Sequence, residues 1–130
     1  MRLHKPFALA LLLVTSLAVA QEENLTQWAQ AMQKEFPPAM CAERALRSCI
    51  KVTDAQCHSG ISKSTRICIA RVTEKSPAKY FSQEQFRKLG SQVGDCAEDL
   101  FAIENKQNLD SSPACIEYTN VIQNSKWKTN

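Results

Sequence analysis

The feature that most constrains how this 130-residue chain can fold is its set of six cysteines. They are Cys41, Cys49, Cys57, Cys68, Cys96 and Cys115. An even number of cysteines in a small exported chain is typical of a disulfide framework. No two of them are separated by only two residues, the spacing that redox-active pairs favour. We therefore expect three disulfide bonds with a structural role.

Residues 1–20 have the pattern of a secretion signal that is cleaved after Ala20. They combine a basic start, an apolar run at 7–14 and small residues before the cleavage point. The apolar run is shorter than the roughly 20 residues that cross a bilayer, and no cysteine follows Ala20 directly, which disfavours a lipid anchor. We expect a protein of the periplasm or the exterior, with residues 21–130 forming one domain.

Removal of this signal leaves a chain that is nearly neutral. It takes away two of the 16 basic residues and none of the 13 acidic ones, so the mature chain carries a net charge of +1. Binding to nucleic acid without sequence preference requires a strong positive field, which such a chain lacks. We therefore expect neither a nucleic-acid partner nor a membrane anchor.

The apolar residues of the mature chain recur at steps of three and four, which is typical of α-helices. Five helices are expected over residues 25–36, 42–50, 53–72, 82–103 and 112–122. Thr53 with Gln56, and Ser82 with Gln85, have the spacing of capping boxes, and the pair Pro37-Pro38 should end the first helix. Ser76-Pro77 should close the third helix, Ser112-Pro113 should open the last, and the chain should fray after Asn124. The expected fold class is all-α, with about five antiparallel helices in a small disulfide-stapled domain.

The disulfide pairing can be predicted if residues 42–50 and 53–72 form an antiparallel helical hairpin. Such a hairpin brings Cys49 toward Cys57 and Cys41 toward Cys68, and Cys96 then pairs with Cys115 by elimination. Sequence alone permits 15 pairings of six cysteines. This prediction depends on Cys41 and Cys49 flanking one helix.

Gly90 and Gly94 lie four residues apart in the helix expected at 82–103. Each glycine costs a helix roughly 1 kcal/mol relative to alanine, so a close approach to the backbone should compensate. Either another helix of the same domain crosses tightly there, or the glycines form a shallow groove or self-association surface. Trp127 lies in a polar tail, where it either docks back onto the domain or marks a contact with a partner.

The sequence contains no arrangement that favours catalysis or metal binding. His58 is the single histidine of the mature chain, and no nucleophile and orienting acid accompany it in a recognisable pattern. Glu98, Asp99 and Glu104 have the spacing of a solvated helix face. We therefore expect no enzyme activity, no cofactor and no metal.

Three functions remain as hypotheses. The first is a non-enzymatic binding protein, of the inhibitor or immunity type, that acts through a protein–protein surface. The second is a structural or assembly component of the cell envelope that self-associates through Gly90 and Gly94, and the third is a small hydrolase or thiol enzyme. The sequence leaves the partner and the oligomeric state open, and Asn24 fits a glycosylation pattern that matters only in a eukaryotic source.

Overall fold

The computed structural model describes residues 23–74 and 80–128, and these form an all-helical domain apart from two paired two-residue strands. The elements are β1 (Glu23–Asn24), α1 (Leu25–Cys41), α2 (Arg44–Cys49), α3 (Asp54–Thr73), β2 (Tyr80–Phe81), α4 (Gln83–Glu104), the 3-10 turns η1 (Lys106–Asn108) and η2 (Pro113–Cys115), and α5 (Ile116–Asn124). The expected all-α, disulfide-bonded fold is confirmed. The expected secretion signal and Ser76-Pro77 lie outside the described residues.

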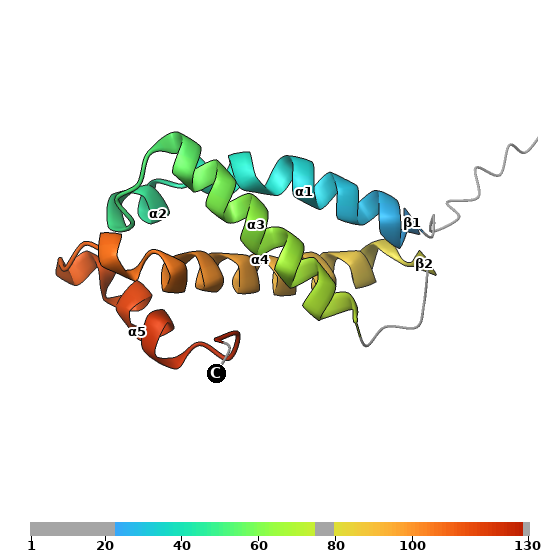
Figure 1. The fold of residues 1–130 in the computed structure, drawn as a ribbon. Helices are drawn as coiled ribbons and strands as arrows, with labels where there is room; N and C mark the ends of the chain where they lie inside the picture. Colours follow the sequence, from blue (N-terminus) through green and yellow to red (C-terminus); the bar gives the residue numbers. More distant parts are fainter. Residues whose placement is uncertain (1–22, 75–79, 129–130) are drawn as a thin grey trace, which may run out of the picture.

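Helix α3 is the central element, because both α1 and α4 pack along it (Figure 1). Strand β1 pairs with β2 in antiparallel register, Glu23 opposite Phe81 and Asn24 opposite Tyr80. This pairing places the first residues of α1 next to the first residues of α4. In Figure 1 the two helices lead away from the strands in the same direction, and α3 runs in the opposite direction.

The predicted capping boxes are both present and fix where the two longest helices begin. The Thr53 hydroxyl accepts from the Gln56 amide at 3.1 Å, and the Thr53 amide donates to the Gln56 side chain at 2.9 Å. Ser82 and Gln85 repeat this exchange at 3.2 and 2.8 Å. Each box satisfies two amides that lack a partner in the first turn of a helix.

Helix α1 continues through Pro37 and Pro38 to Cys41, so the prediction that these prolines end it is wrong. A proline inside a helix removes the hydrogen bond to the carbonyl four residues earlier. Here those carbonyls belong to Gln33 and Lys34, whose side chains are exposed, so water can satisfy them. Because Pro37 is buried, its packing offsets part of the lost bonding.

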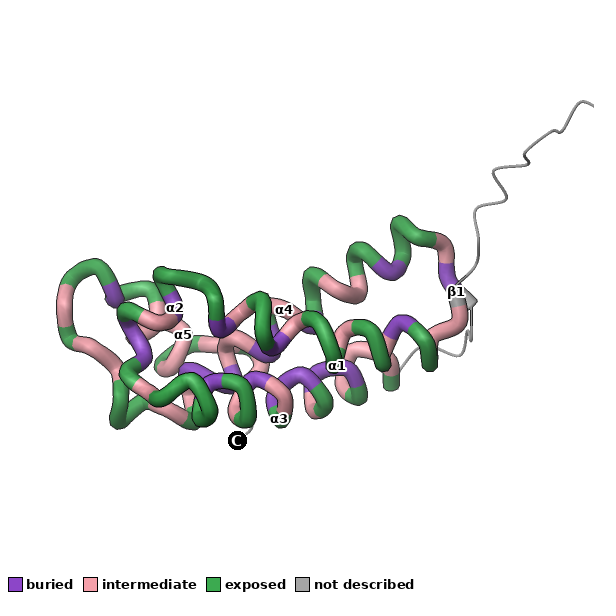
Figure 2. The backbone as a smooth tube through the Cα atoms, turned by 90° about the horizontal axis from the view of Figure 1, so that it is seen from above, coloured by how far each residue is buried: buried purple, intermediate pink, exposed green. Residues whose placement is uncertain are grey.

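The core consists of two clusters that meet near Phe36, which packs against both. The first lies toward the two strands, where Trp28 stacks on Phe86 with ring centroids 5.3 Å apart. The second lies toward α2 and α5 and contains Leu46, Ile61 and Phe101, each no more than 1% exposed. Figure 2 shows how buried residues recur along the helices among exposed ones, as expected for amphipathic helices in a thin domain.

All six cysteines form disulfides, as expected, but the predicted pairing is wrong. The bonds join Cys41 to Cys57, Cys49 to Cys115 and Cys68 to Cys96. The extension of α1 explains the first bond: Cys41 ends α1 instead of starting the next helix, and α1 is antiparallel to α3.

The other two bonds also follow from which helices are neighbours. Cys68 bonds to Cys96 because α3 packs against α4 along much of its length, and not only against the helix before it. Helix α2 has only six residues, too few to form the expected hairpin with α3, and Cys49 instead fixes it to η2.

Candidate functional site

An apolar cleft runs along α1 and has a volume of about 390 Å³. Its lining residues come from successive turns of this one helix: Trp28, Ala31, Met32, Glu35, Phe36 and Ala39. Ala31, Glu35 and Ala39 are exposed, whereas Met32 and Phe36 are half-buried. The only charged group in the lining is the Glu35 carboxylate, so the cleft can accept apolar side chains.

Gly90 and Gly94 of α4 lie against the side chains that form this cleft. A methyl group added at Gly90 would lie 4.0 Å from the sulfur of Met32 and from the ring of Trp28. At Gly94 the nearest atom would be Phe36 Cε2 at 3.5 Å. The structure therefore places α1 side chains, not the backbone of a crossing helix, over the glycines.

Trp127 docks back onto the domain and does not line the cleft. Its carbonyl accepts a hydrogen bond from Arg71 Nη1 of α3 at 2.9 Å, and its amide donates to the Ser125 hydroxyl at 3.1 Å. Ser125 in turn donates to the Asp99 carboxylate at 2.5 Å. The prediction that the chain frays directly after Asn124 is therefore wrong.

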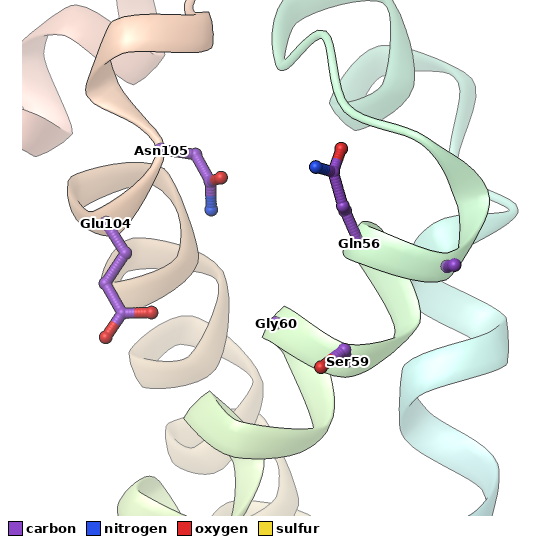
Figure 3. A pocket seen from close by; sticks show the side chains of 6 residues that line it. Gln56, Ser59, Gly60, Glu104 and Asn105 are labelled. Carbon is purple, nitrogen blue, oxygen red and sulfur yellow. The ribbon is translucent and has the colours of Figure 1, made fainter.

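A second hollow, of about 430 Å³, lies where the start of α3 faces the end of α4. Figure 3 shows Gln56 and Asn105 facing each other across it, with Ser59 and Gly60 on α3. Two of its polar groups already bond within the domain: the Asn105 side-chain amide donates to the Phe101 carbonyl at 2.8 Å, and Glu104 pairs with Lys63 at 3.0 Å. The hollow is open to solvent, and its lining contains no cluster of charged or nucleophilic side chains.

A third hollow, of about 220 Å³, is lined by carboxylates of α4 and α5. The Tyr118 hydroxyl donates to Glu98 Oε1 at 2.9 Å. The expectation that Glu98 and Asp99 belong to a solvated face is wrong, because both are half-buried under the C-terminal segment. Glu104 is exposed, as expected.

Burial changes the acidity of both partners in the Glu98–Tyr118 pair. Desolvation raises the pKa of Glu98 above its usual value, and Asp99, Asp95 and Glu43 raise it further, whereas the hydrogen bond from Tyr118 lowers it. Desolvation and the Glu98 charge also raise the pKa of Tyr118. Tyr118 therefore stays protonated and donates at physiological pH.

No group in the described ranges 23–74 and 80–128 brings three histidine, cysteine or acidic side chains together as metal ligands. His58 is exposed and does not line any of the three hollows. None of the helices in the described part of the chain is long and apolar enough to cross a membrane.

The sequence reasoning identified the glycines beside the cleft but missed the helix that forms its walls. The signal was present in α1, where Ala31 and Ala39 extend the apolar stripe of Trp28, Met32 and Phe36. Helices α3 and α4 cover only part of so wide a stripe, so the rest of it stays open.

Comparison with known proteins identifies the family of this chain. A family model described as "T2SS substrate NttA", where T2SS denotes the type II secretion system, matches residues 22–109. The match runs from the residue before β1 to the residue after η1 and contains five of the six cysteines, leaving out Cys115. No curated protein and no solved structure matches the chain.

Proposed function

Because the chain belongs to the NttA family of type II secretion substrates, we propose that it acts as a secreted, non-enzymatic binding protein. In this proposal the apolar cleft along α1 receives apolar side chains of a protein partner. Proteins of this family are secretion substrates, which agrees with the prediction that residues 1–20 are an export signal. The observation that carries the proposal is the cleft itself, because its lining is almost entirely apolar and lies at the surface.

The geometry of the cleft fits a partner helix. Ala31, Glu35 and Ala39 form an exposed row at steps of four residues, beside the half-buried Met32 and Phe36. Small residues in the exposed row leave a furrow, and a furrow of this kind accepts the apolar face of an amphipathic helix. The other two hollows are lined by polar or acidic groups that already bond within the domain.

The disulfides support this function by holding the cleft in one shape. Cys41 ends α1 and is bonded to α3, so the far end of the cleft wall cannot move freely. At the other end, β1 ties α1 to β2, and Trp28 stacks on Phe86. A wall that is already rigid loses little conformational entropy on binding.

Substitutions in the exposed row test the proposal. Ala31→Glu and Ala39→Glu place charge in the cleft, whereas Ala70→Glu places the same change at an exposed position of α3. The immobilised, oxidised mature protein would be incubated with extracts of the cells that the source organism meets, and bound proteins identified. A partner retained by wild type and Ala70→Glu but lost with both cleft variants is the expected result.

Two outcomes would overturn the proposal. One is a partner that binds the cleft variants as well as wild type, and the other is the absence of any partner under repeated capture. Light scattering on the same samples distinguishes self-association from binding of another protein. A dimer that forms with wild type but not with Ala31→Glu would show that a second copy of the chain occupies the cleft.

A further inference from the structure

The apolar cleft along α1 has one charged side chain in its lining, and no cation of the domain neutralises it. Glu35 is exposed in the middle of the row that Ala31 and Ala39 complete. The neighbouring charge on α1, Lys34, lies about 100° round the helix from Glu35 and does not line the cleft. Neither of the two ion pairs in the described part of the chain involves Glu35. Its carboxylate is therefore available to a cation of whatever enters the cleft.

More acidic groups lie at the far end of the cleft, where α1 ends. Glu43 follows α1, and Asp95 follows Gly94 on α4, and both carboxylates are exposed. Both act on the half-buried Glu98, so they approach it from two different segments. Because Gly94 lies against the Phe36 ring of the cleft, this end is bordered by negative charge.

The charges balance at the other end of the cleft, near the two strands. Arg87 of α4 lies three residues before Gly90 and so on the same face of the helix as that glycine, which lies against Trp28. Glu84 lies one turn earlier, and it is exposed, as Arg87 is. One positive and one negative group at this end leave negative charge in excess along the cleft as a whole.

A second copy of the chain does not match this pattern of charge. A two-fold contact centred on the exposed row would place the Glu35 carboxylates of both copies next to each other. Like charges that meet in a contact repel, and apolar surroundings strengthen the repulsion. The charges therefore favour a different protein that carries basic groups.

We propose that the cleft selects a cationic amphipathic helix of another protein, in which a lysine or arginine within the apolar stripe pairs with Glu35. This inference rests on the proposed function and adds the chemistry of the partner. The methylene groups of a lysine or arginine cover apolar surface while the charged end reaches a carboxylate. Further basic residues toward the far end of the cleft would meet Glu43 and Asp95.

Two synthetic helical peptides test the selection. Each is about 18 residues long, which favours a helix, and has a leucine stripe with either a lysine or a glutamate at its centre. Their binding to the oxidised mature protein would be measured by fluorescence anisotropy at low salt. We expect the lysine peptide to bind about fivefold more tightly than the glutamate peptide, and this preference to shrink at high salt.

Charge reversal at Glu35 locates the effect. Glu35→Lys should reverse the preference, so that the glutamate peptide binds more tightly. Glu117→Lys makes the same change at an exposed position of α5 and is the matched control. It should keep the wild-type preference for the lysine peptide.

The inference and the proposed function fail in different ways. If wild type binds both peptides equally and Ala31→Glu abolishes both, the cleft is a binding site but does not select charge, and the inference is overturned. Equal preferences in Glu35→Lys and wild type would also overturn it. If neither peptide binds wild type, the inference falls, and the capture experiment with Ala31→Glu and Ala39→Glu decides on the cleft separately.

Discussion

Gly60 of α3 lies in tight contact with a core side chain. A methyl group built there would lie 2.6 Å from the ring of Phe101, which is only 1% exposed. Gly90 and Gly94 lie in looser surroundings, with the nearest atoms at 4.0 and 3.5 Å. The sequence draws attention to Gly90 and Gly94, because these two glycines interrupt a strong helical pattern. Which glycine is sterically required depends on the side chains of the neighbouring helix, and the sequence does not show which helix that is.

Alanine substitutions at Gly60 and Gly90 should therefore have opposite effects on stability. Gly60→Ala forces the buried Phe101 ring to move, and overpacking of this kind costs about 1–3 kcal/mol. Gly90→Ala meets only ordinary van der Waals contact and should gain up to about 1 kcal/mol of helix propensity. Urea unfolding of both variants beside wild type measures the two changes. Equal effects would mean that α3 and α4 do not pack as described.

At the scale of elements, the helices are the most predictable part of the fold. The capping residues Thr53 and Ser82 place the starts of α3 and α4 correctly, because a capping box is a local interaction. The course of α1 through Pro37 and Pro38 was not predictable, since it depends on the burial of Pro37 and on the exposure of the turn before it. Helix α5 illustrates the same limit, because its attachment depends on the half-buried Glu98 and Asp99.

Pro38→Ala tests whether α1 is continuous. Pro38 is exposed, and alanine would restore an amide that can bond to the Lys34 carbonyl. Proline costs about 3 kcal/mol relative to alanine inside a helix, although neighbouring Pro37 limits how much of this is recovered. We expect the free energy of unfolding to rise by about 1 kcal/mol, as measured by urea titration. A decrease would indicate that the segment is not helical.

At the scale of the whole molecule, the disulfides link elements that are distant in the sequence. Cys49 and Cys115 are 66 residues apart, whereas Cys41 and Cys57 are 16 apart. The number and class of the bonds followed from the cysteine count and export signal, but the pairing depended on the order in which helices pack. The cleft could not be predicted from the sequence for the same reason, because its open side depends on where α3 and α4 lie against α1.

The two bonds should differ in how much they stabilise the fold. Replacing Cys49 and Cys115 by alanine releases the longer loop and should cost more than replacing Cys41 and Cys57, by about 1 kcal/mol from loop closure alone. Unfolding of the two double variants under non-reducing conditions measures the difference. All four cysteines are buried, so the lost packing is similar in both.

Three disulfides fix α1, α2 and α4 to the elements that they pack against and so hold the domain in one shape. Mass spectrometry of a non-reduced digest of the exported protein tests it most directly. The structure predicts peptides that join Cys41 to Cys57, Cys49 to Cys115 and Cys68 to Cys96. Peptides joining Cys41 to Cys68 or Cys96 to Cys115, or a free thiol in the native protein, would contradict the account.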